Sequence, residues 1–254
     1  MTTARRLYVL TGASRGLGAA LAEQLLAPDV QLLTLSRHPD DSLGSRAHAI
    51  GALLEQWTID IGHDIGVAAR LEAWLHRRGR AGFVAAALIN NAGLLGHVGP
   101  IETSPADDIA AVLRVDLEAP MLLTSAFLRA TRSWPIDRRV LSISSGAGKR
   151  AVAGWATYCA AKAGLDHFSR VAALDEAMLP NPARIVALAP GIVDTDMQAE
   201  LRAADGTGFP EQAHFVEFKA TGQLSTPQAA AARVLSYLHR ADFGHEPVAD
   251  VRQA

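Results

Sequence analysis

A glycine-rich turn near the N-terminus, TGASRGLG at residues 11–18, separates a short apolar run from a stretch with helical periodicity. Gly12 permits a tight turn, Gly16 lets the backbone approach a ligand closely, and Gly18 allows the helix to pack against the strand. The free N–H groups and the dipole at the start of such a helix favour a bound pyrophosphate. This unit therefore predicts an α/β chain whose first strand, turn and helix form a dinucleotide site.

The rest of the chain alternates between strand-like and helix-like segments. Strands are expected at residues 7–11, 30–35, 56–60, 83–89, 139–144, 184–189 and 248–251. Helices are expected at residues 17–26, 65–78, 105–132, 155–178 and 226–240. The unbroken apolar run at 83–89 is typical of a parallel strand that is buried on both faces. Repeated right-handed β-α-β connections predict the α/β class, with a single Rossmann-type doubly wound parallel sheet flanked by helices.

No linker, internal repeat or block of like charge divides the chain, so residues 1–254 are expected to form a single domain. The least regular segment, residues 198–224, places several glycines beside Phe209, Phe215 and Phe218. A loop of this length in a compact domain is usually functional, and often it is a lid over a site. The alternative is a disordered surface insertion.

Charge and cysteine content narrow the partners and the location. Lys+Arg 24 against Asp+Glu 26 gives a net charge of −2, which lacks the basic surplus of a nucleic-acid-binding protein. The single cysteine, Cys159, cannot form an intramolecular disulfide, and no cluster of Cys and His has the spacing of a metal site. No signal peptide is evident, and no apolar run reaches the roughly 18 residues that a membrane helix needs. These features predict a cytoplasmic protein with a small-molecule partner and no metal.

The end of the second expected strand indicates which dinucleotide is bound. An NAD site usually has an acidic residue there, which binds the ribose 2′-hydroxyl. Here the strand ends in Leu-Ser-Arg-His, and the first carboxylate after it is Asp40. Arg37, together with Arg15 in the glycine turn, could clamp a 2′-phosphate by charge-assisted hydrogen bonds. NADP(H) is therefore favoured, and the alternative is that both arginines are merely solvated.

A possible catalytic pair lies on the helix expected at 155–178. Tyr158 and Lys162 are four positions apart, so their side chains project from one face. A tyrosine that exchanges protons near neutrality needs its pKa lowered from about 10. An ammonium about 4 Å away stabilises the ionised phenol by about 4 kcal/mol at an effective dielectric constant near 20. This energy corresponds to a pKa that is lower by about three units. Ser145, at the end of the preceding expected strand, could bind a substrate carbonyl.

Taken together, these segments resemble the short-chain dehydrogenase/reductase family over nearly the whole chain. The matching segments are TGASRGLG at 11–18, Asp60, NNAG at 90–93, Ser145, YxxxK at 158–162, and Pro190-Gly191 followed by Val193, Thr195 and Met197. The resemblance implies that Tyr158 donates a proton to the carbonyl oxygen and that Ser145 orients that oxygen. It also implies that Lys162 lowers the tyrosine pKa and holds the ribose of the cofactor.

The resemblance also implies a set of cofactor contacts. The residues are Gly12, Ser14, Arg15, Gly16, Leu17, Gly18, Arg37, Asp60, Ile61, Asn91, Ala92, Gly93, Tyr158, Lys162, Pro190, Gly191, Ile192, Val193 and Thr195. Within this set, Asp60 and Ile61 would contact adenine, Asn91 the ribose, and residues 192–195 the nicotinamide side.

One position departs from the family pattern. Members of the family usually carry an asparagine in the helix after NNAG, where it organises a water-linked proton relay largely through its backbone carbonyl. This chain has Asp116 there, in the sequence Val115-Asp116-Leu117. We expect Asp116 to belong to the catalytic set and the relay to survive, because the carbonyl is retained. The alternative is that Asp116 only makes a hydrogen bond within the helix.

Within the family, the segments at 154–162 and 190–198 resemble the sepiapterin reductase group, and bacterial benzil reductases share much of the same signature. The resemblance implies an NADPH-dependent reductase that acts on a small aromatic or heterocyclic ketone or dicarbonyl. The substrate contacts implied are Ser145, Trp155, Tyr158, Met197, Gln198 and Asp250. Asp250 is included because an aspartate near the C-terminus of sepiapterin reductase anchors the pterin.

Two other readings stay open at this point. One is a reductase of 3-ketoacyl thioesters or another alcohol/ketone oxidoreductase of the same family. The other is a non-catalytic NADP(H)-sensing module, which would be free to lose the tyrosine and the lysine.

The family also implies a homodimer or homotetramer formed through the helices near 105–130 and 155–178.

Overall fold

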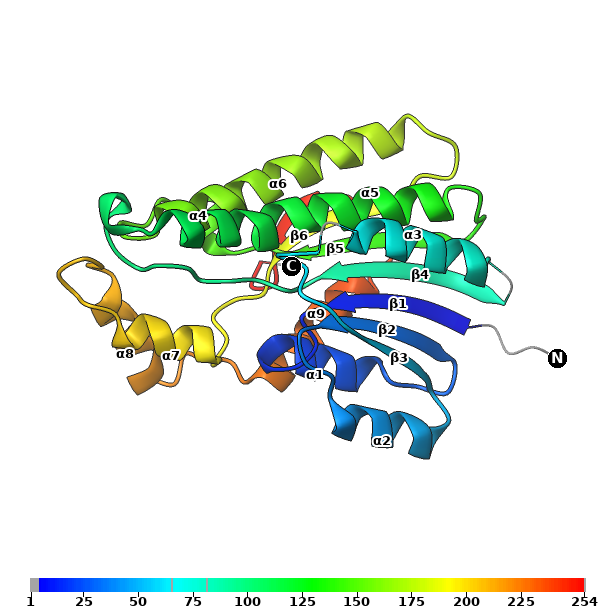
Figure 1. The fold of residues 1–254 in the computed structure, drawn as a ribbon, viewed down its shortest axis with the longest axis horizontal. Coiled ribbons are helices and arrows are strands. Elements are labelled where there is room, and N and C mark those ends of the chain that lie inside the picture. Colours follow the sequence, from blue (N-terminus) through cyan, green and yellow to red (C-terminus); the bar gives the residue numbers. More distant parts are fainter. Residues whose placement is uncertain (1–4, 65, 81, 254) are drawn as a thin grey trace.

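A computed structural model describes residues 5–64, 66–80 and 82–253, and its centre is a seven-stranded sheet (Figure 1). The strands are β1 (Arg5–Thr11), β2 (Val30–Ser36), β3 (Leu53–Thr58), β4 (Phe83–Asn90), β5 (Asp137–Ile143), β6 (Arg184–Ala189) and β7 (Val248–Asp250). They lie in the order β3-β2-β1-β4-β5-β6-β7, and every neighbouring pair is parallel. The predicted fold class, a doubly wound parallel sheet, is therefore confirmed.

Helices cover both faces of this sheet. They are α1 (Gly16–Leu25), α2 (Asp41–Ile50), α3 (Val67–Arg78), α4 (Ala106–Leu113), α5 (Ala119–Thr131), α6 (Ala156–Ala177), α7 (Asp196–Ala203), α8 (Gln212–Ala220) and α9 (Pro227–Leu238). In Figure 1, α1 and α9 lie on one face of the sheet, and α3, α5 and α6 lie on the other. Among the helices of the described ranges, none is long and apolar enough to cross a membrane.

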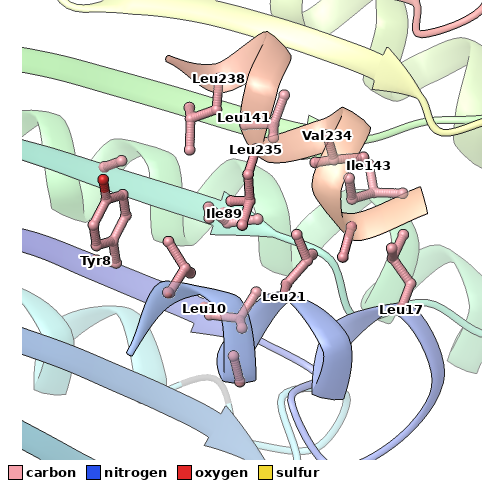
Figure 2. Close-up of a cluster of buried hydrophobic side chains, with 14 of the residues drawn as sticks. Tyr8, Leu10, Leu17, Leu21, Ile89, Leu141, Ile143, Val234, Leu235 and Leu238 are labelled. Atoms are coloured by element: carbon pink, nitrogen blue, oxygen red, sulfur yellow. The ribbon is translucent and has the colours of Figure 1, made fainter. Parts of the chain in front are cut away.

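Alternating side chains of the strands form two separate cores. In β1, Leu7 and Val9 belong to the core beneath α3, α5 and α6, whereas Tyr8 and Leu10 face α1 and α9. This alternation follows from the two-residue period of a strand, which sends successive side chains to opposite faces. Figure 2 shows the second core, where leucines of α1 and α9 meet side chains of β1, β4 and β5. Packing on both faces holds the strands in register and fixes where each strand ends.

The strand order reverses between β1 and β4, which are neighbours in the sheet. Leu10 pairs with Ile89, so the carboxyl ends of β1 and β4 lie side by side. Their following chains turn to opposite faces of the sheet, one into α1 and the other toward α4 (Figure 1). Ligands of open α/β sheets bind in the crevice at such a switch point.

The segment from α2 to α3 differs from the sequence-based expectations. Helix α2 was not predicted, because its only buried side chains are Leu43 and Ala47 and its apolar face is therefore narrow. Strand β3 begins and ends earlier than the expected 56–60. The helix expected at 65–78 begins at Val67 in the structure, and Ile65 lies outside the described residues.

The long helix expected at 105–132 is interrupted, and the expected irregular segment is partly helical. Between α4 and α5, residues Arg114–Glu118 form a π-helical turn. Most of α7 and all of α8 fall inside residues 198–224, which were expected to lack regular structure. The sequence did not predict these two helices because both are short. In addition, α8 has no fully buried side chain and therefore lacks a continuous apolar stripe.

Candidate active site

A cavity of about 920 Å³ lies at the carboxyl ends of the strands and extends beneath α7 and α8. The loops after β1, β2, β3, β4, β5 and β6 all contribute to its walls. The predicted site residues in its lining are Gly12, Ser14, Arg15, Gly16, Leu17, Gly18, Arg37, Asp60, Ile61, Asn91, Ala92, Gly93, Asp116, Ser145, Trp155, Tyr158, Lys162, Pro190, Gly191, Ile192, Val193, Thr195, Met197 and Gln198. The fold therefore brings together residues that are far apart in the sequence.

The glycine turn has the shape that a pyrophosphate requires. Gly12 and Gly16 have positive φ angles of 71° and 55°, which L residues with a side chain rarely adopt. Gly16 is the first residue of α1, so the free N–H groups of the helix face the cavity. Two glycines in a tight turn directly before the free N–H groups of a helix fit the diphosphate of a dinucleotide.

Asn91 braces this turn from the neighbouring strand. Its side-chain Nδ2 donates hydrogen bonds to the carbonyl oxygens of Thr11 (3.0 Å) and Gly12 (3.1 Å). The Thr11 hydroxyl accepts hydrogen bonds in return from the backbone N–H groups of Asn91 and Ala92, each at 3.0 Å. The amide of Asn91 thus holds the loop in shape, and its predicted ribose contact stays a prediction. Asn90 is buried and bridges Thr124 and Ser142.

The end of the cavity beyond the glycine turn contains both acidic and basic side chains. Asp60 accepts a hydrogen bond from the Gly62 N–H at 2.9 Å, which fixes the loop after β3. Arg37 is exposed and lines the cavity directly after β2. Arg15 also lines it, but its guanidinium pairs with Asp196 at the start of α7, 3.1 Å away. Arg15 therefore needs to leave or share Asp196 to bind a ligand phosphate, whereas Arg37 has no such competitor among its described contacts.

Ser145, Tyr158 and Lys162 meet at the centre of the cavity. Tyr158 lies in the first turn of α6 and is 7% exposed, and Lys162 lies one turn later and is 4% exposed. The ammonium of Lys162 is 5.5 Å from the centre of the Tyr158 ring. The Ser145 hydroxyl accepts a hydrogen bond from the Ala147 N–H at 3.2 Å, which begins the turn after β5. A hydroxyl pair with an adjacent cation suits proton transfer to or from a carbonyl oxygen.

The pKa of Tyr158 is shifted upward, whereas the sequence predicts a downward shift. Burial raises the pKa of Tyr158 above its ordinary value. The Lys162 ammonium and the Ser145 hydroxyl act to lower it, as expected, but the negative charge of Asp116 acts with burial. The net direction is upward because the phenol is enclosed by protein and a carboxylate lies nearby.

Asp116 contacts Lys162 directly. Its Oδ2 lies 3.0 Å from the Lys162 Nζ, and its Oδ1 accepts a hydrogen bond from the Leu94 N–H at 2.7 Å. Asp116 lies in the π-helical turn, where the Ala119 N–H donates to the carbonyl of Arg114. Pro120 has no N–H, so the usual helical bond to the Asp116 carbonyl cannot form. Pro120 is therefore the feature of the sequence that indicates this interruption of the helix expected at 105–132.

Aromatic side chains form the wall of the cavity beside Tyr158. The Trp155 ring centre is 4.9 Å from that of Tyr158 and 5.7 Å from that of Phe215. Phe218 packs edge-on against Phe215 at 5.9 Å. Phe215 and Phe218 line the cavity, so α8 supplies part of its wall. Phe209 does not line the cavity. It is fully buried and packs against Trp155 in a third, smaller apolar cluster.

Asp250 is the predicted site residue that the structure does not bring to this cavity. Its carboxylate binds the guanidinium of Arg252 at 2.6 Å and 2.9 Å, and 7% of the residue is exposed. Arg252, rather than Asp250, is in the cavity lining. Position in the sequence placed Asp250 near the site, but β7 directs its side chain to its neighbour instead.

Sequence reasoning also missed Arg150, which lies in the turn after β5 and lines the cavity. Its guanidinium binds the Glu211 carboxylate at 2.9 Å, just before α8 begins. A second ion pair joins Lys219 of α8 to Asp194 at 2.5 Å. These pairs connect α8 to the body of the protein on both sides of the cavity, and no local sequence pattern predicts contacts of this range.

Comparison with protein families gives one match of wide coverage. The family described as short chain dehydrogenase matches residues 6–206, which include the glycine turn, Ser145, Tyr158 and Lys162. This match covers more than half of the chain.

Individual relatives agree with that match. The chain is 33% identical to the benzil reductase ((S)-benzoin forming) of Bacillus cereus over 238 residues, with 94% of this chain and 96% of the relative covered. It is 31% identical to the sepiapterin reductase of Bos taurus over 253 residues, which cover 94% of this chain and 91% of the relative. A solved metagenomic short-chain oxidoreductase in complex with NADP superposes with a TM-score of 0.72 at 26% identity, covering 98% of this chain and 96% of that one.

Proposed function

The chain belongs to the short-chain dehydrogenase/reductase family, and we propose that within it the protein is an NADPH-dependent reductase of a small aromatic or heterocyclic ketone or dicarbonyl. The observation that carries this proposal is the shared cavity. The glycine turn, Tyr158, Ser145 and the aromatic wall of Trp155 and Phe215 all line one cavity, and Trp155 contacts the rings of both Tyr158 and Phe215. A cofactor held by the glycine turn and a flat apolar substrate held by the aromatic wall would meet at the tyrosine.

NADPH, when held by the glycine turn and Arg37, would supply the hydride that the carbonyl carbon takes up. Tyr158 donates its phenolic proton to the carbonyl oxygen as charge develops there. Ser145 hydrogen-bonds the same oxygen and aligns it with the phenol. Lys162, whose Nζ donates to the Ile143 carbonyl at 3.1 Å, is held as a fixed positive charge beside the tyrosine. The aromatic wall excludes water from the reacting groups.

The preference for NADPH over NADH rests on the residues after β2. Arg37 is an exposed cation at the cavity edge, and Ser36 precedes it where an NAD site has a carboxylate. Arg15 adds a second guanidinium at the start of α1, which the negative 2′-phosphate would draw from Asp196. The solved relative in complex with NADP is consistent with this assignment.

Consumption of NADPH in the presence of benzil, sepiapterin and a 3-ketoacyl thioester tests the proposal. We expect turnover of the aromatic dicarbonyl or the pterin, because both fit a wall of flat aromatic side chains. Turnover of the thioester alone would move the protein to the other candidate, a ketoacyl reductase. Tight NADPH binding without turnover of any carbonyl would favour the non-catalytic NADP(H)-sensing module instead.

We also propose that the protein is a homodimer or homotetramer that associates through α5 and α6. Large apolar side chains on these helices are exposed, including Leu174 (68%), Met178 (77%) and Met121 (41%). A second copy of the same face would cover them. Light scattering of the purified protein and of a Leu174→Glu variant tests this, since the variant is expected to dissociate.

The single cysteine, Cys159, supports the reducing cytoplasm as the location of the protein.

A further inference from the structure

The catalytic lysine shares its buried site with a carboxylate. Lys162 Nζ lies 3.0 Å from Asp116 Oδ2 and donates to the Ile143 carbonyl at 3.1 Å. Asp116 is fully buried, and its other oxygen is bonded to the Leu94 N–H. The pair is therefore removed from solvent, and each charge is the principal partner of the other.

The backbone around the pair leaves room for a side chain of the size of aspartate at position 116. The π-helical turn buries Val115 and Asp116 next to each other. On the opposite side, a Cβ on Gly93 would lie 3.2 Å from Asp116 Oδ2, closer than ordinary packing allows. A glycine in the loop after β4 thus leaves the room that the carboxylate occupies.

We propose that Asp116 is a positioning residue that fixes the Lys162 ammonium and, by its negative charge, keeps Tyr158 protonated up to a higher pH than the ammonium alone would allow. This inference rests on the proposed function of the same site. A protonated tyrosine is the form that donates to a carbonyl oxygen, and a tyrosinate is the form that accepts a proton from an alcohol.

The charges around Tyr158 act in the required directions. An unpaired ammonium would stabilise the tyrosinate, and a carboxylate beside it offsets that effect. The groups that face Tyr158 or Lys162 are Asp116 from the π-helical turn, Ser145 from the turn after β5, and Cys159 and Asp166 from α6. Burial lowers the pKa of Lys162, but Asp116, Tyr158 and Asp166 together outweigh it and the net direction is upward, so the lysine stays charged. Burial raises the pKa of Asp116 above its ordinary value, and Lys162 and the Leu94 N–H act in the opposite direction.

The substitution that tests this role is Asp116→Asn, which removes the charge and keeps an oxygen for the Leu94 N–H. Glu118→Gln is the matched control, since it makes the same chemical change at an exposed position of the same turn. Reduction of benzil with NADPH and oxidation of benzoin with NADP⁺ are both measured as kcat/KM against pH. In Asp116→Asn we expect the alkaline fall of reduction and the alkaline rise of oxidation both to move down by about one pH unit. Glu118→Gln should follow the wild type.

A second measurement does not depend on turnover. Ionisation of Tyr158 is followed by tyrosinate absorbance, with the Tyr158→Phe protein subtracted in each background. The midpoint is expected at lower pH in Asp116→Asn than in the wild type. An unchanged midpoint, or an equal loss of both activities at every pH, would overturn the role assigned to Asp116. A wild type that reduces no carbonyl but shows the shifted midpoint would instead contradict the proposed function and leave the charge effect established.

Discussion

Gly18 lies so close to Gly12 that a Cβ on Gly18 would be 1.8 Å from the Gly12 carbonyl oxygen. The same Cβ would be 2.5 Å from the Asn91 Nδ2, whose hydrogen bonds hold the turn. No rotamer can relieve these contacts, because the Cβ position is fixed by the backbone. The third glycine of the turn is thus required by packing between the turn and the helix.

Gly18→Ala is therefore expected to destabilise the protein by about 3 kcal/mol and to weaken NADPH binding at least tenfold. Urea unfolding and a fluorescence titration with NADPH measure the two effects. Gly44→Ala is the matched control, since the nearest atom to its new Cβ is the Gln56 Nε2 at 3.8 Å. In the middle of α2 this change should stabilise the fold by about 0.5 to 1 kcal/mol. Equal stability of the Gly18 variant and the wild type would contradict the close contact.

Tyr158→Phe should lower kcat at least about 100-fold, because it removes the proton donor and retains the ring. Binding of NADPH should remain close to that of the wild type, since the phenyl ring still packs against Trp155 at the same position. Stopped-flow measurement of NADPH oxidation and an equilibrium titration separate the two. Tyr237→Phe, on α9 and outside the cavity lining, provides the control and should retain full activity. Turnover by Tyr158→Phe near the wild-type rate would exclude this residue as the acid.

Arg37→Ala is expected to raise the Kd for NADPH by about tenfold or more and to change the Kd for NADH little, because only NADPH carries the 2′-phosphate. Calorimetric titration with each cofactor gives the ratio. Arg46→Ala is a suitable comparison, as Arg46 is an exposed cation on the nearby α2 and pairs with Glu23. A parallel loss of affinity for both cofactors would mean that Arg37 supports the loop and does not read the phosphate.

The cavity residues that follow the strands were predictable from sequence because they lie directly after apolar runs. The runs at 83–89 and 185–189 are continuously apolar, and residues such as Asn91 and Pro190 follow them at fixed positions. The part of the cavity wall formed by α7 and α8 was harder to predict, since these helices are held by tertiary contacts such as Arg150–Glu211. Asp250 lies outside the cavity lining for a related reason: a short terminal strand says little about which way a side chain turns. The π-helical turn was missed because apolar periodicity continues across it.

Glu176→Gln tests a buried charge cluster between the end of α6 and β5. Glu176 accepts a hydrogen bond from the Ala183 N–H at 2.7 Å and faces Arg132 and the fully buried Arg138. Removing its charge leaves Arg138 without a buried counter-ion, which is expected to cost about 3 kcal/mol at pH 7. Glu246→Gln, at a side chain that is 72% exposed, should change the free energy of unfolding by less than about 0.5 kcal/mol.

The lowered pKa of Glu176 predicts that the free energy of unfolding depends on pH. Burial alone would raise the pKa of Glu176, but Arg132, the Ala183 N–H and Arg138 outweigh it, so the pKa lies below the ordinary 4.5. A lowered pKa in the folded state means that the ionised group stabilises the protein above pH 4.5 and that this contribution is lost as the pH falls through the folded value. The stability difference between the wild type and Glu176→Gln should therefore narrow in acid. A difference that stays constant from pH 7 to pH 3 would show that the charge is not responsible.

The contact between Gly154 and Gly208 limits how freely the substrate range can be redesigned. Gly154 has a φ of 80°, and a Cβ there would be 2.6 Å from the Gly208 carbonyl oxygen. The next residue, Trp155, touches both Phe209 and the ring of Tyr158. Residues 198–224 are therefore not an independent module that can be exchanged between homologues. A transplanted segment has to bring its own counterparts of Gly154 and Trp155, or it will displace the proton donor together with the pocket it was meant to reshape.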